Sequence, residues 1–139
     1  MSAATAAHCA SASPAVNGHH WLLDLSDCQA PAHLLEDATA LAPLLLQAAC
    51  DAGMDVVGHV FHQFAPTGVT GAVILAESHL TVHTWPESKF VAIDVYVCDF
   101  NCANHTKGER LAQALTELFA ASVCHRQAVS RASTPSTSS

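Results

Sequence analysis

Histidine and cysteine are the residue types in this chain that could do chemistry. The 139 residues include 10 histidines, against 5 lysines and arginines together, and 6 cysteines. Imidazole and thiol groups bind metal ions and transfer protons near neutral pH, but many of them are purely structural. Composition alone therefore leaves metal binding, acid–base chemistry and a structural role open, and the positions of these residues must separate them.

The cysteines and histidine near residue 100 are the obvious candidate for a metal site. Cys98, Cys102 and His105 have C-x3-C-x2-H spacing. A structural zinc site needs four ligands, and no second ligand pair stands at a known spacing from these three. The sequence therefore predicts no metal site.

Cys98 ends a segment with a clear strand pattern. In residues 90–98 the aliphatic side chains alternate with others, so Val91, Ile93, Val95 and Val97 share one face of the strand while Ala92, Asp94, Tyr96 and Cys98 share the other. We expect the aliphatic face to pack against helices. Cys98 would then lie on the uncovered face, beside polar neighbours at a strand end, where a site could form.

The elements around this strand follow from hydrophobic periodicity and turn residues. Strands are predicted at residues 19–25, 56–64, 69–76, 80–84 and 90–98, and helices at about 40–52 and 106–122. Thr39 is the expected N-cap of the first helix, with Pro43 in its fourth position, and Thr106 with Glu109 matches a capping box. Hairpins with flanking helices predict an α+β two-layer sandwich, an antiparallel sheet with helices on one face.

Composition excludes several classes of protein. Hydrophobic residues are 50% and charged residues 12% of the chain, which fits one globular domain, predicted at 18–125. The ends, 1–17 and 126–139, are Ala/Ser/Thr-rich and are expected to be disordered tails. No apolar run reaches the roughly 20 residues that span a membrane. The net charge of −7 without a basic stripe argues against a nucleic-acid partner.

Three stretches of sequence carry a resemblance to a known family. They read FHQFAPTGVTG at 61–71, AESHLTVHTWPE at 76–87 and DVYVC at 94–98. Together they resemble the prokaryotic S-adenosylmethionine decarboxylase proenzymes, over roughly residues 19–119. The resemblance implies the fold of that family and a homodimer of processed units, with the uncovered sheet face available for pairing.

The resemblance also implies that the chain cuts itself. The broken bond would be Glu77–Ser78, giving a β chain of residues 1–77 and an α chain of residues 78–139. Ser78 would become a pyruvoyl group, whose ketone is the electron sink that pyridoxal phosphate provides in other decarboxylases, so no added cofactor is needed.

Roles for other residues follow from the same resemblance. His83 corresponds to the proton acceptor of processing, and Thr70 stands where the family commonly has a processing serine. Cys98 corresponds to the proton donor of decarboxylation. Phe64 and Trp85 correspond to the aromatic side chains of the adenine pocket.

The substrate and product expected from this family are S-adenosylmethionine and its decarboxylated form, used for spermidine synthesis. Glu87 corresponds to the carboxylate that holds the ribose hydroxyls of S-adenosylmethionine. An adenosine pocket favours this substrate over a simple amino acid.

Two alternatives remain open from the sequence. The same cleavage chemistry could serve an ornithine or arginine decarboxylase, because a net charge of −7 suits a cationic substrate. An unprocessed homologue or metal-binding module could instead regulate an active partner. The scattered cysteines and the absence of a secretory-signal pattern predict a cytoplasmic protein with reduced thiols.

Overall fold

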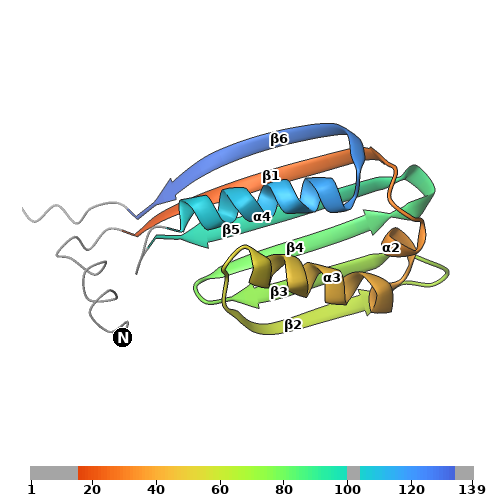
Figure 1. Cartoon of the computed structure of the whole chain (residues 1–139), viewed down its shortest axis with the longest axis horizontal. Helices are drawn as coiled ribbons and strands as arrows, with labels where there is room; N and C mark the ends of the chain where they lie inside the picture. Colours follow the sequence, from red (N-terminus) through yellow and green to blue (C-terminus); the bar gives the residue numbers. More distant parts are fainter. Residues whose placement is uncertain (1–15, 100–103, 134–139) are drawn as a thin grey trace, which may run out of the picture.

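The computed structural model describes residues 16–99 and 104–133, which form one antiparallel sheet with helices on one face (Figure 1). The sheet is six-stranded, in the order β2-β3-β4-β5-β1-β6. The strands are β1 Asn17–Cys28, β2 Val56–Gln63, β3 Val69–Leu75, β4 Ser78–Trp85, β5 Phe90–Cys98 and β6 Ala121–Ala132. The helices are α2 His33–Glu36, α3 Ala38–Asp51 and α4 His105–Leu118, with a short 3-10 turn at Pro86–Ser88. The predicted α+β two-layer sandwich is confirmed.

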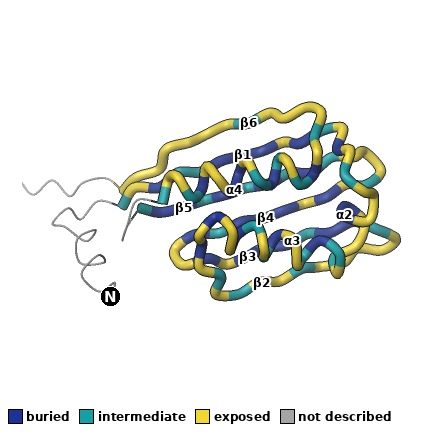
Figure 2. Tube along the Cα trace, viewed as in Figure 1, coloured by how far each residue is buried: buried dark blue, intermediate teal, exposed yellow. Residues whose placement is uncertain are grey.

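The core lies between the sheet and the two longer helices (Figure 2). Leu41 and Leu45 of α3 and Leu111 and Leu115 of α4 are fully buried against it. The β5 strand alternates as expected, with its aliphatic side chains buried and the residues between them half-buried. Strand alternation and helix periodicity thus direct the apolar side chains of the sheet and of the helices into one shared layer. Their removal from water in this layer stabilises the fold.

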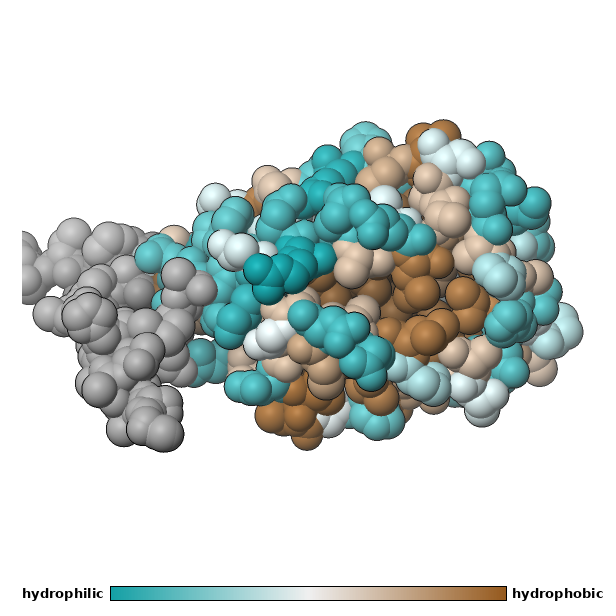
Figure 3. All heavy atoms as spheres, viewed as in Figure 1, coloured by the Kyte–Doolittle hydropathy of each residue, from teal (hydrophilic) through white to brown (hydrophobic). Residues whose placement is uncertain are grey.

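The helix side carries a shallow apolar groove between α3 and α4 (Figure 3). It encloses about 380 Å³ and is lined by Leu44, Ala48, Ala114 and Leu118 among others. No helix within residues 16–99 and 104–133 is long and apolar enough to cross a membrane.

The opposite face of the sheet, here called the open face, has no helix against it in the described chain. Several large apolar side chains on this face are exposed. They are Val60, Ile74, Val123 and Val129 on the strands, with Phe64 and Trp85 beside one end of the sheet. An apolar face of this kind favours association with another surface.

The two ends of the sheet carry different loops. At the Ser78 end lie the β3–β4 turn, the last residue of β5 and the first residues of β1. At the Trp85 end lie the β2–β3 turn over residues 64–68 and the 3-10 turn after β4. Antiparallel pairing fixes this division, because each hairpin returns the chain to the end it left.

Both predicted helix N-caps are wrong, and each observed N-cap lies two residues earlier in the chain. The N-cap of α3 is Asp37, whose carboxylate accepts hydrogen bonds from the backbone N–H of Thr39 at 2.9 Å and from its hydroxyl at 2.7 Å. Since α3 begins at Ala38, Pro43 is its sixth residue and removes the bond that the Thr39 carbonyl would accept. The Asp37 carboxylate, a stronger acceptor than a neutral hydroxyl, caps the helix two residues before Thr39 and also binds the Thr39 hydroxyl.

The start of α4 differs for a tertiary reason. Its N-cap is Asn104, without a side-chain cap bond, and Glu109 does not reach back to form the capping box with Thr106. Instead Glu109 accepts a hydrogen bond from the indole N–H of Trp21 at 3.1 Å and pairs with Arg126. A buried indole N–H needs an acceptor, and Glu109 is placed to supply it.

The C-terminal expectation is corrected by β6. Helix α4 ends at Leu118, short of the predicted 122, and Ala121–Ala132 pairs along almost all of β1, so residues 126–132 are not a tail. Asn17 likewise belongs to β1. The rest of the two predicted tails, 1–15 and 134–139, lies outside the described residues, as does Cys102 of the rejected metal cluster.

Candidate functional site

Ser78, the residue expected to become the pyruvoyl group, is the first residue of β4. It is only 8% exposed, and its hydroxyl has no hydrogen-bond partner among the described residues. The preceding residue, Glu77, has a left-handed backbone with φ of 60°, which is unfavourable for a residue with a Cβ. A buried hydroxyl without a partner costs about 1–3 kcal/mol. The Glu77–Ser78 bond therefore joins two locally unfavourable features.

Cys98 lies at the same end of the sheet. Residues His79 and Tyr96 face each other in the β4–β5 ladder, which brings the end of β5 next to the start of β4. Cys98 is 5% exposed, and its carbonyl accepts a hydrogen bond from the Asn104 side chain at 2.8 Å. The thiol is thus held at the Ser78 end, on the open face as predicted.

The neighbourhood of Cys98 is closed by Tyr96. Opposite Cys98 in β1 stands Gly18, and a Cβ there would lie 2.5 Å from the Tyr96 hydroxyl. The glycine therefore makes room for the phenol ring. Asp99 also fixes the end of β5. Its carboxylate accepts a hydrogen bond from the backbone N–H of Asn104 at 2.6 Å and lies 2.9 Å from the His19 ring nitrogen.

The other expected site residues gather at the Trp85 end. A hollow of about 220 Å³ is lined by Phe64, Thr70, His83, Trp85 and Glu87, together with neighbours from the same turns. The Thr70 hydroxyl and His83 Nδ1 are hydrogen-bonded at 3.0 Å, which orients the imidazole. Phe64 and Trp85 are 46% and 41% exposed, so both rings can contact a ligand. The hollow thus offers two aromatic faces and a carboxylate.

A buried hydroxyl and a side-chain amide hold the turn that presents Phe64. The Thr84 hydroxyl, on a residue 6% exposed, accepts from the Val69 N–H at 2.9 Å and donates to the Leu35 carbonyl at 2.7 Å. The Gln63 amide donates to the carbonyls of Glu36 at 2.8 Å and Gly68 at 3.1 Å. These bonds tie the α2–α3 junction to the β2–β3 turn. Neither Gln63 nor Thr84 was predicted as a functional residue, although both lie inside the stretches that carry the resemblance.

The two groups of site residues do not meet within one chain. Ser78 and His83 are five residues apart on one strand, which corresponds to about 17 Å, and an odd spacing puts them on opposite faces. The structure places Ser78 and Cys98 at one end of the sheet, with Ser78 on the helix face and Cys98 on the open face. It places His83 beside Thr70 and Trp85 at the other end, so most of the length of β4 separates the two groups. Within a single chain the expected site residues therefore form two separate groups, here called the Ser78 half-site and the Trp85 half-site.

A polar cluster lies on the open face beside the Ser78 half-site. No pattern in the sequence predicted it. The rings of His79 and Tyr96 stack at 5.7 Å between centroids, and Arg131 lies over Tyr96 at 5.2 Å. A His20 ring nitrogen is 3.6 Å from the Asp94 carboxylate. Burial lowers the pKa of His79, and the nearby His20 lowers it further, while Asp94 opposes them. His79 therefore favours its neutral form.

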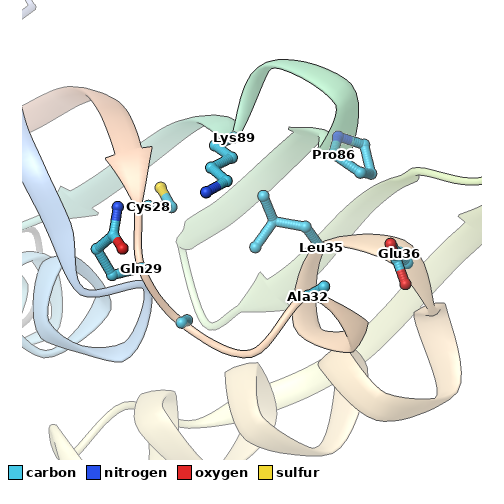
Figure 4. Close-up of a pocket in the computed structure, with 8 residues that line it drawn as sticks. Cys28, Gln29, Ala32, Leu35, Glu36, Pro86 and Lys89 are labelled. Atoms are coloured by element: carbon cyan, nitrogen blue, oxygen red, sulfur yellow. The ribbon is translucent and has the colours of Figure 1, made fainter.

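A further hollow, of about 280 Å³, lies behind the turn that carries Glu87 (Figure 4). Cys28, Gln29, Leu35 and Lys89 line it, from the end of β1, from α2 and from the turn before β5. Burial raises the pKa of the Cys28 thiol to about 11, with a contribution from Asp27. The thiol is therefore protonated near neutral pH and is a poor nucleophile.

Comparison with known proteins identifies the family. The family model described as S-adenosylmethionine decarboxylase matches residues 19–132. A Pyrococcus horikoshii protein named S-adenosylmethionine decarboxylase proenzyme is 36% identical over 114 residues, which are 82% of this chain and 78% of the relative. A Thermodesulfovibrio yellowstonii protein of the same name is 40% identical over 102 residues, 73% of this chain and 71% of the relative.

A solved structure agrees with these sequence matches. The crystal structure of the adenosylmethionine decarboxylase from Aquifex aeolicus has a TM-score of 0.77 and 27% sequence identity, and it covers 92% of this chain and 99% of that chain. The family model also covers β6, because its match runs to residue 132. The open-faced sheet, the buried serine at its turn and these relatives agree, and the chain belongs to the S-adenosylmethionine decarboxylase family of enzymes.

Proposed function

We propose that this chain is a proenzyme that cuts its own Glu77–Ser78 bond and then decarboxylates S-adenosylmethionine. The observation that carries the proposal is the buried Ser78 hydroxyl without a partner, directly after the left-handed Glu77. In a proenzyme this hydroxyl is free to attack the preceding carbonyl. The β chain would be residues 1–77 and the α chain residues 78–139. The names of the relatives, which are proenzymes, support the same reading.

A pyruvoyl group at residue 78 supplies a ketone that binds the substrate amine and accepts the electron pair released with CO₂. The residues present fit such a group, because an unpartnered serine hydroxyl is the required precursor. Cys98, at the same end of the sheet, would return a proton to the substrate α-carbon. Its burial keeps bulk water away from that proton transfer.

The Trp85 half-site would bind the adenosine portion of the substrate. The exposed faces of Phe64 and Trp85 can stack on a purine and stabilise the nearby sulfonium cation. The Glu87 carboxylate can accept hydrogen bonds from two ribose hydroxyls. His83, oriented by Thr70, is the proposed base of processing.

We infer that two chains pair through their open faces, because one chain cannot join its half-sites. A two-fold axis perpendicular to the strands would lay the Ser78 end of one chain over the Trp85 end of its partner. His83 of the partner could then approach the Ser78 turn. The exposed apolar side chains of the open face, such as Val60 and Ile74, would be buried by this pairing.

The first test is the mass of the purified protein under denaturing conditions, compared with Ser78→Ala. We expect two fragments that divide at Glu77/Ser78, the second blocked by a ketone, and one intact chain for the variant. Product analysis with S-adenosylmethionine, ornithine and arginine then identifies the substrate. A single intact wild-type chain would overturn the proposal.

The paired half-sites are tested by mixing two inactive variants. Ser78→Ala removes the ketone from one chain, and Trp85→Ala removes an adenosine contact from the other. Heterodimers hold one intact composite site, so co-expression should restore about one quarter of wild-type activity, since half of random dimers are mixed and one of their two sites is complete. Activity no greater than that of the separate variants would show that each site is built within one chain.

The enzyme's location is a further part of the proposal. Cys28, Cys50, Cys98 and Cys124 are free thiols, which fits a reducing compartment such as the cytoplasm. Cell fractionation of the natural host tests this placement.

A further inference from the structure

A small hollow lies against the proposed cleavage site on its other side. It encloses about 190 Å³ at the Ser78 end of the sheet. Its walls come from the loop after α3, from the β3–β4 turn and from the start of α4, and the lining residues are Gly53, Met54, Asp55, Ala76, Glu77, Asn104 and Lys107. Glu77, the residue whose carbonyl would be attacked, therefore shares a hollow with a lysine.

Lys107 is notable because cations are rare in this protein. The chain has only 5 lysines and arginines, and all of them lie in the described residues. Arg126 pairs with Glu109, Arg131 lies over Tyr96, and Lys89 lines the hollow behind the other turn. Within residues 16–99 and 104–133 Lys107 has no ion-pair partner, and of the five cations it alone lines the hollow beside Glu77.

The stem of Lys107 passes beside Gly53. A Cβ at Gly53 would lie 3.5 Å from Cε and 3.6 Å from Cδ of Lys107, so the methylene groups pass close over this glycine. Gly53 has a φ of 88°, a conformation that residues with a side chain rarely adopt. Gly53 is therefore required by the backbone turn after α3, and the Lys107 stem passes beside this turn along the hollow.

Self-cleavage would create a new anion at this place. In the first step Ser78 Oγ attacks the Glu77 carbonyl carbon, the C–N bond breaks, and the hydroxyl proton passes to the released Ser78 amine, which leaves a backbone ester. A base then removes the Ser78 α-proton, the Cβ–Oγ bond breaks, and the Glu77 α-carboxylate leaves with the electron pair. The resulting enamine tautomerises to an imine, and water converts the imine to the ketone with release of ammonia.

We propose that Lys107 binds the Glu77 α-carboxylate that this elimination releases, and stabilises it as the leaving group. The inference rests on the proposed function, since it concerns a step of self-processing. The ammonium group supplies the charge that opposes the one developing in the transition state. The site lies at the start of α4, whose positive end adds to the field.

Carboxylates in the same hollow increase the effect that the Lys107 charge would have on the leaving group. Asp55 and the Glu77 side chain already contribute carboxylates to the hollow, and cleavage adds another at Glu77 itself. Among the described side chains that line the hollow, Lys107 is the one cation, and the charged side chains beside it are both carboxylates. Like charges raise the energy of an anion that forms beside them, so without Lys107 elimination should slow while ester formation is less affected.

The test measures self-cleavage of newly purified Lys107→Gln, Lys107→Arg and Arg110→Gln. Lys107→Gln should cut itself about tenfold more slowly than wild type, as expected for loss of one stabilising charge. The variant should also accumulate the ester intermediate. Hydroxylamine cleaves this ester to a hydroxamate at Glu77, which mass spectrometry detects. Lys107→Arg should recover most of the rate. Arg110 is an exposed cation on the same helix outside the hollow, so Arg110→Gln should match wild type.

The outcomes separate this inference from the proposed function. Wild-type cleavage at Glu77–Ser78 with an unchanged rate in Lys107→Gln would overturn the role of Lys107 alone. Slower cleavage without trapped ester would also overturn it, because the lysine would then act before elimination or on folding. An uncut wild-type chain would overturn the proposed function and this inference with it. Urea unfolding of each variant in the Ser78→Ala background identifies any loss of stability.

Discussion

Replacing Thr84 by valine should destabilise the fold and loosen the turn that presents Phe64. Valine has nearly the same shape as threonine, so the change opens no cavity, but it removes the hydroxyl that binds the Val69 N–H at 2.9 Å and the Leu35 carbonyl at 2.7 Å. Each buried group left without a partner costs about 1–3 kcal/mol. With two such groups, we expect the free energy of unfolding to fall by about 2–6 kcal/mol.

The assay is urea unfolding followed by tryptophan fluorescence, in the Ser78→Ala background so that the chain stays uncut. Thr116→Val is the matched control. The Thr116 hydroxyl donates to the Ala112 carbonyl at 2.9 Å, which in α4 is also the acceptor of the Thr116 N–H, so its loss should cost less than about 1 kcal/mol. Equal effects of the two substitutions would refute the reasoning. In the cleavable chain, Thr84→Val should also raise KM more than it lowers kcat.

The remaining predictions concern thiols and one imidazole. Cys98→Ala should still cut itself, but a CO₂-release assay should show decarboxylation at least about a hundredfold slower, as expected for loss of a general acid. Full activity of the variant would overturn the role of Cys98 as proton donor. Because burial lowers the pKa of His79, the unfolded chain binds a proton at this residue more readily than the folded chain, so stability should fall as the pH drops below about 6.5. The urea midpoint of Ser78→Ala should therefore fall at low pH, and it should fall less when His79→Gln is also present. With its pKa raised to about 11 and its side chain buried, Cys28 should resist iodoacetamide at pH 8 while exposed Cys50 reacts, and equal labelling by peptide mass would contradict this.

The central hairpins could be predicted from the sequence because local pattern and tertiary setting agree there. Strands β3, β4 and β5 alternate strongly, and the predicted ranges match the observed ones within one or two residues. Strand β6 could not be predicted in the same way. It is an edge strand whose residues are mostly exposed on both faces, so it has no alternation to mark it, and it forms because β1 offers it an unpaired edge.

The predicted helix starts were wrong for a different reason. Several polar side chains near each start could bind the same N–H groups, and local sequence does not rank them. At α4 the choice depended on Trp21, distant in the chain, whose buried indole engages Glu109. At α3 it depended on Asp37, two residues before the expected cap.

The sequence by itself determined the family, the fold class and the residue types that could act, because motif residues and strand periodicity are local properties of the chain. Tertiary structure alone decided which of these residues meet. A period of two tells which face a side chain takes, but only the pairing of β4 with β3 and β5 shows that Ser78 and Cys98 share one end of the sheet while His83 and Trp85 share the other. The packing of α4 on the sheet places Lys107 in the same hollow as Glu77, although 30 residues separate them in the chain.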